Sequence, residues 1–260
     1  ERLPWGTIAV IGTTSAVALG SYYLLFRKKP EPEPEPEEKG PKVVYLIRHG
    51  QSTFNAAYEL TEKDPMIFDA DLSDLGKKQV EELETKCKSL DPMPEVVLSS
   101  PLTRALKTAL GGFKGSGVPV QVEPLLTEHL TDSCDIGSTP TELEQRFKGS
   151  GVSFKHLDTI WWYTDSEADE PQTSPEACQR HYQQYGYMEP PLHLNARVEK
   201  IVEIVNNHEA QCIALVGHAD YMNELADAIT GSEEDLWLAN CEIKMFEVKE
   251  PEVVVNWGDG

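Results

Sequence analysis

The 260-residue sequence is short of cysteine and of positive charge, and each shortage argues against a class of protein. Its five cysteines are scattered and odd in number, and they show no Cys-x-x-Cys pair and no Cys/His ligand spacing. This pattern argues against a zinc site and against a disulfide scaffold. We expect free thiols in a reducing compartment. The cysteines are Cys87, Cys134, Cys178, Cys212 and Cys241.

Basic residues are outnumbered by acidic ones. Lysine and arginine total 23 against 44 aspartates and glutamates, which gives a formal net charge of −21. Such an excess of negative charge repels the phosphates of nucleic acids and anionic lipid headgroups. We therefore expect no nucleic-acid partner, and no membrane binding through general electrostatic attraction.

One long apolar run lies near the N-terminus. Residues 5–26 carry no charged side chain, and as a helix they would measure about 33 Å, enough for a hydrocarbon core of roughly 30 Å. Trp5 at one end and Arg27–Lys29 just after the other resemble interfacial anchors. We predict a transmembrane helix over 5–26, preceded by a flank at 1–4. The alternative is a signal-peptide core, but such cores are shorter and lack a basic C-terminal flank.

Small residues recur within this predicted span. Gly12, Ala16 and Gly20 are spaced four apart, which suits close packing against another helix, although glycine and alanine are common in membrane helices. The alternating Pro/Glu stretch that follows, Pro30–Pro41, favours an extended, solvated spacer. We assign 27–41 to a basic flank and spacer, and 42–260 to a single functional domain.

The domain sequence alternates between short apolar runs and helical patterns. Strands are predicted at Val43–Ile47, Val96–Ser99, Val118–Val122, Cys212–Val216 and Ile243–Val248. Helices are predicted at Leu75–Leu90, Pro101–Leu110, Ala196–Asn207 and Asp220–Thr230. This alternation predicts an α/β fold with a mostly parallel central sheet and helices on both faces. The stretch from Leu130 to Leu194 has few strand signals, and we interpret it as a mainly helical insertion over the strand ends.

Three apolar runs end in residues that bind anions. Arg48 and His49 follow the first strand, Arg104 lies at the start of the helix after the second, and His218 follows the run at 212–216. In a parallel sheet, ligands bind where strand C-terminal ends meet helix N-termini. Guanidinium groups suit a phosphoryl group because their planar fork donates two parallel hydrogen bonds. The sequence therefore predicts an anion site at this edge of the sheet.

Four stretches, taken in chain order, carry a family resemblance. They read "LIRHGQSTFN", "SSPLTRALKTA", "LLTEHL…CDIG" and "LVGHAD". Together they resemble the motifs of the histidine phosphatase superfamily, the phosphoglycerate mutase-like group, across about 42–248. Departures are small: an arginine often precedes the glutamate of the third motif, and Ala219 replaces a common glycine.

The resemblance implies roles for particular residues. His49 would be the nucleophile, while Arg48, Arg104 and His218 would bind the phosphoryl oxygens and stabilise their charge. Asn55 would add a further donor to the same phosphate. Glu128 would protonate the leaving oxygen and then activate water, with Asp132 and Asp135 as rival acids. Chemistry of this kind rests on positioning and electrostatics, so we expect no metal and no cofactor.

Three functions fit this resemblance. The first is hydrolysis of a phosphomonoester, either a small phosphorylated molecule or a phosphoprotein, through phosphohistidine. The second is a mutase, which needs additional basic residues, and "TEHLTDSCDIG" contains no arginine or lysine. The third is a structural subunit of an organellar membrane complex that retains the phosphatase fold. We favour the first and expect its specificity to come from the 130–194 insertion.

Location is predicted from the basic flank and from the resemblance. Positive charge after the span favours a domain on the matrix, stroma or cytosolic side, whereas stop-transfer import would place it on the opposite side. A branch of the superfamily that is tethered to mitochondrial membranes has a similar N-terminal arrangement. We expect a single-pass protein of an organellar membrane, mitochondrial or plastid, with its orientation left open.

Overall fold

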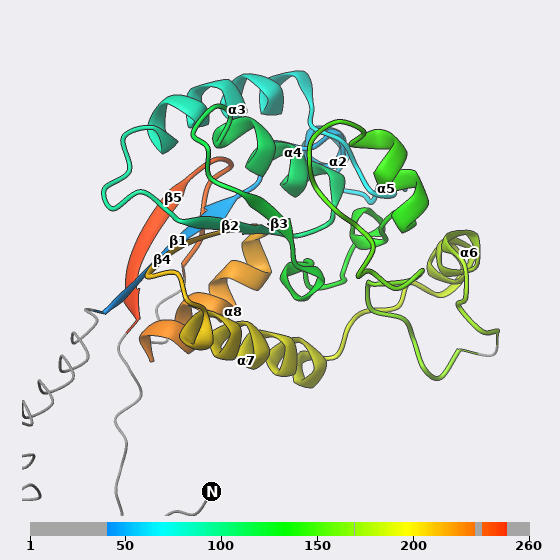
Figure 1. Cartoon of the computed structure of the whole chain (residues 1–260). Helices are drawn as coiled ribbons and strands as arrows, with labels where there is room; N and C mark the ends of the chain where they lie inside the picture. Colours follow the sequence, from blue (N-terminus) through cyan, green and yellow to red (C-terminus); the bar gives the residue numbers. More distant parts are fainter. Residues whose placement is uncertain (1–40, 169, 232–235, 249–260) are drawn as a thin grey trace, which may run out of the picture. The chain divides into compact units, whose positions relative to one another are not determined.

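The computed structural model describes residues 41–168, 170–231 and 236–248 (Figure 1). The predicted transmembrane helix at 5–26 lies outside these residues, as does the spacer up to residue 40. Within the described ranges, no helix is both long enough and apolar enough to cross a bilayer.

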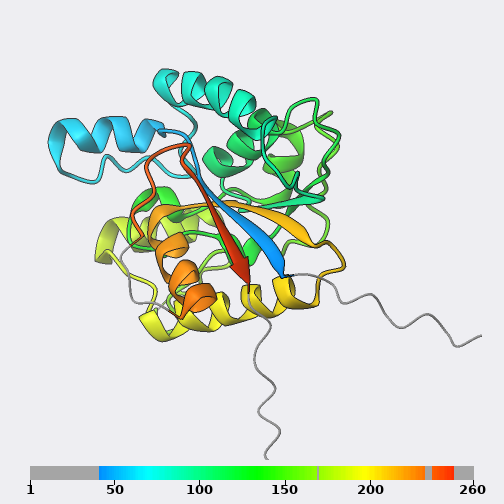
Figure 2. The same cartoon turned by 90° about the vertical axis from the view of Figure 1, so that its left-hand side faces the viewer.

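The described residues form a five-stranded sheet in the order β3-β2-β4-β1-β5. Its strands are β1 (Lys42–Arg48), β2 (Val96–Ser99), β3 (Val120–Val122), β4 (Cys212–Gly217) and β5 (Ile243–Val248). The first four run parallel, and β5 pairs antiparallel with β1 at one edge, as the red and blue strands of Figure 2 show. This confirms the mostly parallel sheet, although β3 begins two residues later than predicted.

Helices cover both faces of the sheet (Figure 1). Helices α3 (Asp74–Cys87) and α4 (Thr103–Gly112) lie on one face, and α7 (Pro191–Asn207) and α8 (Ala219–Thr230) lie on the other. Side chains alternate along β1 accordingly: Tyr45 and Ile47 pack with α3 and α4, whereas Val44 and Leu46 pack with α7 and α8. Burying each such aliphatic side chain contributes about 1.5–3 kcal/mol, so the two apolar faces of the strands specify this layering.

The insertion at 130–194 is not mainly helical, which corrects the prediction. It contains a 3-10 turn η2 (Ser133–Asp135), α5 (Pro140–Arg146), α6 (Pro175–Tyr185) and the start of α7, whereas 147–168 and 170–174 are irregular. Aromatic packing and side-chain hydrogen bonds stabilise the irregular stretches between these helices. Trp162 packs among buried side chains that include Tyr182 and Tyr187, and Trp161 donates its indole N–H to the Ser138 carbonyl at 2.9 Å.

Some helix boundaries also differ from those predicted. The sequence analysis missed α2 (Thr53–Thr61), which buries only Phe54 but is capped by reciprocal hydrogen bonds between Ser52 and Asn55. Helix α7 begins at Pro191, a favourable first-turn residue, five positions before the predicted start. Helix α4 begins at Thr103 without a side-chain cap. A second 3-10 turn, η1 (Pro124–Leu126), leads from β3 toward Glu128.

Candidate active site

Backbone pairing brings the two motif histidines together. Strands β1 and β4 are parallel neighbours, with Arg48 in register with Gly217. His49 and His218 are the next residues on each strand, and their ring centroids lie 5.1 Å apart. Strand β2 borders β4 on its other side and leads into α4, whose first turn carries Arg104. The three strand ends therefore meet at one edge of the sheet, as the sequence predicts.

The contacts of His49 define its protonation. Its Nδ1 lies 2.7 Å from the Gly50 carbonyl, which can only accept, and its Nε2 lies 3.2 Å from Nε of Arg104, which can only donate. His49 is therefore a neutral imidazole with its proton on Nδ1 and a lone pair on Nε2. Burial lowers the pKa of His49 well below its usual value, and the charges of Arg104 and Arg48 lower it further. A neutral, buried Nε2 is the form of histidine that can act as a nucleophile.

His218 is fully buried and only partly paired. Its Nε2 lies 2.9 Å from the Ser100 hydroxyl, whereas its Nδ1 is buried without a hydrogen-bond partner among the described residues. Burial lowers the pKa of His218 well below its usual value, and the nearby Arg104 adds to this effect. The Nδ1 atom of His218 can therefore form a hydrogen bond with a polar group that enters the site.

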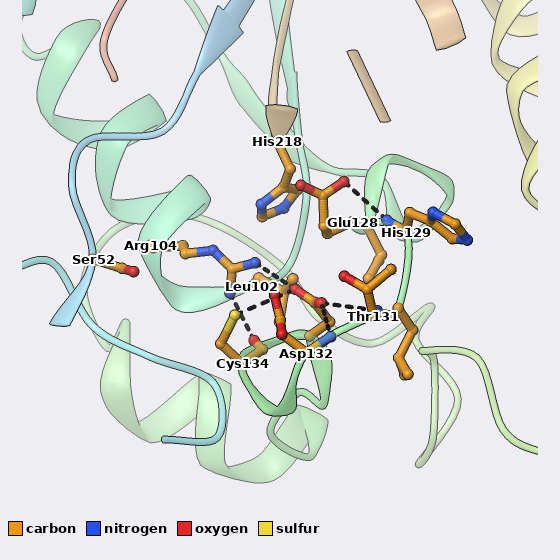
Figure 3. Close-up of polar contacts among 12 residues, drawn as sticks. Ser52, Leu102, Arg104, Glu128, His129, Thr131, Asp132, Cys134 and His218 are labelled. Carbon is orange, nitrogen blue, oxygen red and sulfur yellow. Dashed lines mark hydrogen bonds and ion pairs between the residues drawn. The ribbon is translucent and has the colours of Figure 1, made fainter. Parts of the chain in front are cut away.

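The two arginines of the site are held differently. Arg104 donates Nη1 to the Cys134 carbonyl at 2.7 Å and Nη2 to Asp135 at 2.8 Å (Figure 3). Arg48 donates Nη1 to the Leu238 carbonyl at 2.7 Å, but its buried Nε has no partner in the described structure. The site thus combines a rigid cation at Arg104 with an unsatisfied donor at Arg48, which together favour binding of an anion.

Glu128 is the candidate general acid, and its carboxyl group is buried in the site. Its Oε1 accepts hydrogen bonds from the backbone N–H groups of His129 and Tyr221, both at 2.9 Å, and Figure 3 draws it with Arg104 and His218. Burial raises the pKa of Glu128 to about 8, and the charges of Asp220 and Asp135 contribute to the rise. Glu128 is therefore mostly protonated at pH 7 and has a proton to donate.

The two rival acids have different environments. Asp135 is occupied by Arg104 and by the backbone N–H groups of Thr131 and Asp132, so it acts as a structural partner. Burial, together with Asp135 and Asp64, raises the pKa of Asp132 to about 6, below that of Glu128. The carboxyl group with the higher pKa is the better proton donor at neutral pH, which favours Glu128.

Asn55 lies in a capping contact. Its Oδ1 accepts hydrogen bonds from the backbone and side chain of Ser52 at the start of α2. Among the described residues, no hydrogen bond joins Asn55 to either motif histidine, so its role as a phosphate donor stays a prediction.

Within residues 41–168, 170–231 and 236–248, no group of three or more histidine, cysteine, aspartate or glutamate side chains is arranged to hold a metal ion. All five cysteines are buried and free, which confirms the expected thiols.

The sequence analysis missed three neighbours of the site. Ser100 contacts His218, and Asp220, in the first turn of α8, raises the pKa of Glu128. Trp237 is 67 % exposed, and its ring faces the Arg48 guanidinium at 5.6 Å. The signals for Ser100 and Asp220 lay inside the quoted motifs "SSPLTR" and "GHAD", beside residues that were selected. Trp237 has no local signal, because only folding brings it to Arg48.

Two curated phosphatases resemble this chain in sequence. The chain is 32 % identical over 128 residues to the Schizosaccharomyces pombe protein named "Probable phosphatase", covering 46 % of this chain and 56 % of that protein. It is 35 % identical over 118 residues to the glucosyl-3-phosphoglycerate phosphatase of Mycolicibacterium vanbaalenii, covering 45 % and 48 %. The chain thus spans about half the length of these curated relatives.

The fold matches that of a solved phosphatase. The α-ribazole phosphatase of Shigella flexneri superposes with a TM-score of 0.52 at 18 % identity, covering 80 % of this chain and 91 % of that one. At this identity the likeness concerns the fold alone. The family model described as "Histidine phosphatase superfamily (branch 1)" matches residues 44–259. The chain therefore belongs to the histidine phosphatase superfamily.

Proposed function

We propose that the domain at 42–260 hydrolyses phosphomonoesters through a phosphohistidine intermediate on His49. The observation that carries this proposal is the neutral, buried Nε2 of His49, which lies beside Arg104 and 5.1 Å, ring to ring, from His218. Membership of the superfamily supports the same activity.

In the first step, the hydrogen bond from Arg104 Nε to Nε2 of His49 breaks, and the lone pair on this Nε2 attacks the phosphorus atom. The P–N bond forms as the bond between phosphorus and the leaving oxygen breaks. Glu128 transfers its proton to that oxygen, so the product leaves as a neutral alcohol and Glu128 becomes a carboxylate. Arg48, Arg104 and the unpaired Nδ1 of His218 stabilise the charge on the phosphoryl oxygens.

In the second step, the Glu128 carboxylate removes a proton from a water molecule as that water attacks phosphorus. The P–N bond breaks, inorganic phosphate leaves, and both His49 and Glu128 return to their starting states. Because the pKa of Glu128 is raised to about 8, one carboxyl group can serve as acid and then as base near neutral pH.

We propose a phosphorylated small molecule or a phosphoprotein as the substrate. A pocket of about 470 Å³ adjoins Glu128, and its wall includes Ile160, Trp161 and Tyr163 from the 130–194 insertion. This supports the expectation that the insertion sets specificity. The segment that would bind a second acidic group in a mutase, "TEHLTDSCDIG", contributes Asp132 and Asp135 instead of basic residues, which favours hydrolysis over transfer.

The test is to trap the intermediate. Incubation with ³²P-labelled phosphomonoesters, followed by quenching in alkali, should yield a protein-bound phosphate that is stable to alkali and labile to acid. His49→Ala should abolish both this species and phosphate release, whereas the control His156→Ala should retain them. EDTA should leave the activity intact, because the proposed chemistry needs no metal. Turnover by His49→Ala would refute the proposal, and inactivity on a broad substrate panel would favour the structural-subunit alternative.

We also propose that a transmembrane helix at 5–26 tethers this domain to an organellar membrane, mitochondrial or plastid. The proposal rests on the uncharged span and its basic flank. The Gly12/Ala16/Gly20 stripe would contact a helix of a larger membrane complex.

A further inference from the structure

A single guanidinium group holds the backbone that carries Glu128. Arg197 of α7 donates Nη1 to the carbonyls of Leu125 at 2.7 Å and of Thr127 at 2.8 Å. Its Nη2 donates to the carbonyl of Glu128 itself at 3.3 Å. Residues 127–130 are neither helix nor strand. Side-chain hydrogen bonds therefore help to fix their path, together with backbone bonds at Thr127 and Leu130.

Arg197 is itself fixed by a fully buried carboxylate. Glu189 accepts from Nε of Arg197 at 2.9 Å and from its Nη2 at 2.7 Å, which is the bidentate geometry of a strong charge-assisted pair. Glu189 also contacts the residues just after Glu128: its carboxylate accepts from the N–H of Leu130 at 3.3 Å, and its carbonyl lies 2.8 Å from Nε2 of His129. The ion pair therefore forms hydrogen bonds with the backbone both before Glu128, at Thr127, and after it, at Leu130.

A second link runs through α8. The guanidinium of Arg197 lies over the Tyr221 ring at 5.0 Å, and the backbone N–H of Tyr221 donates to Oε1 of Glu128. Arg197 thus contacts the main chain of Glu128 and also the residue that orients its carboxyl group.

We propose that Arg197 and Glu189 are positioning residues that hold the Glu128 carboxyl group in line with the leaving oxygen. This inference rests on the proposed function, in which Glu128 donates the proton. A general acid must lie within hydrogen-bond reach of the atom it protonates, and a displacement of about 1 Å can cost 10²-fold in rate. Loosening the segment should therefore impair protonation of the leaving group more than binding of the phosphoryl group.

The choice of substrate separates these two effects. A poor leaving group such as the alkoxide of glycerol 2-phosphate needs the proton from Glu128, whereas 4-nitrophenolate leaves with little assistance. The test variants are Arg197→Lys, which keeps the charge without the fork, and Arg197→Leu/Glu189→Leu, which removes both charges so that neither is left unpaired. In single-turnover experiments, both should lower the rate of phosphohistidine formation from glycerol 2-phosphate about 100-fold and that from 4-nitrophenyl phosphate less than about 5-fold. This step is measured because hydrolysis of the phosphohistidine, in which Glu128 acts as the base, is common to both substrates.

Arg180→Leu and Glu128→Gln are the control variants. Arg180→Leu, at an exposed position on α6, should leave both rates unchanged. Glu128→Gln should reproduce the substrate pattern, and adding the Arg197 substitution to Glu128→Gln should cause little further loss, because the two act as a unit. Equal losses on both substrates in a folded variant, or no loss on either, would overturn the proposal.

A measurement without turnover distinguishes this inference from the proposed function. If the wild-type protein forms no phosphohistidine, the proposed function fails. The pKa of the Glu128 carboxyl group can still be followed by NMR with ¹³C-labelled glutamate. Release of the segment should admit water and bring that pKa down toward its usual value in both Arg197 variants. An unchanged pKa would show that Arg197 and Glu189 do not position Glu128.

Discussion

Arg104 and Asp135 form an ion pair in which Nη2 and Oδ1 are 2.8 Å apart and the two side chains are only 3 % and 2 % exposed. The same guanidinium donates Nε toward Nε2 of His49 at 3.2 Å. Asp135 is fixed in turn by the backbone N–H groups of Thr131 and Asp132. Asp135 of the insertion therefore contacts the proposed nucleophile indirectly, through Arg104. Its buried carboxylate holds the Arg104 guanidinium in position and balances its positive charge.

Removal of the Asp135 carboxylate should lower the stability of the folded protein. Asp135→Ala leaves Arg104 buried without its charge partner, so the free energy of unfolding should fall by about 3–5 kcal/mol. Denaturant unfolding measures this change. Asp74→Ala is the matched control because it breaks the exposed Asp74–Lys77 pair, and it should leave stability unchanged. A loss of stability no greater than that of the control would show that the Arg104–Asp135 pair does not support the fold.

The sequence predicted the sheet and its edge because both depend on local patterns. Apolar runs mark the strands, and parallel pairing of neighbouring strands then brings His49 and His218 to one edge. Helices with a clear apolar stripe, such as α3 and α8, were predicted to within a few residues. Helix α2 has nine residues and buries only Phe54, and the sequence analysis missed it.

The contacts between distant segments could not be predicted in this way. Trp237 reaches Arg48, and Asp135 reaches Arg104, only after the chain has folded. The insertion was predicted to be helical because it lacks strand signals, but its order comes from aromatic packing and side-chain hydrogen bonds. A single sequence indicates which residue types can react, whereas their partners depend on tertiary structure.

Substitution of Gly76, which packs against the segment that follows His49, should impair the protein. A Cβ at Gly76 would lie 2.0 Å from the carbonyl oxygen of Gln51, two residues after His49. Because that neighbour is backbone, Gly76→Ala should displace the loop, lower stability by about 1–3 kcal/mol and reduce activity. Thermal unfolding and phosphate release measure the two effects.

Gly111 provides the comparison for Gly76. A Cβ at Gly111 would lie 2.2 Å from Cγ1 of Val80, which is a side-chain atom. Val80→Ala should therefore rescue Gly111→Ala, whereas no trimming of a side chain should rescue Gly76→Ala. Wild-type activity and stability in Gly76→Ala would contradict the predicted close approach.

The proposed membrane tether can be tested apart from the domain. Carbonate extraction of membranes should leave the full chain in the pellet and release a version that begins at Lys42, because the acidic domain should not bind anionic lipid. Release of the full chain would refute the tether. Gly12→Leu and Gly20→Leu should reduce co-purification of helix partners; unchanged partners would refute only the packing role of the small-residue stripe.

The rate of phosphohistidine formation should fall at alkaline pH. The pKa of Glu128 is raised to about 8, and only its protonated form can donate to the leaving oxygen. Above about pH 8 the single-turnover rate for an alkyl phosphate should therefore drop about tenfold per pH unit. In Asp220→Asn, the fall in rate should begin at a lower pH, because the Asp220 charge helps to raise the pKa of Glu128. Glu128→Gln should remove this alkaline fall in rate, and an unchanged fall in that variant would exclude Glu128 as the proton donor.

The raised pKa of Glu128 should also make the folded protein less stable as pH rises. Because the folded pKa of Glu128 exceeds its usual value, the native state binds more protons than the unfolded state between these two values. The stability contributed by Glu128 is therefore fully present below its unfolded pKa and is lost as pH rises through about 8. Glu128→Gln should flatten the fall in unfolding free energy across this window, whereas Glu199→Gln, at an exposed position on α7, should not. Identical pH profiles for wild type and Glu128→Gln would contradict the raised pKa and, with it, the assignment of Glu128 as an acid that is protonated at neutral pH.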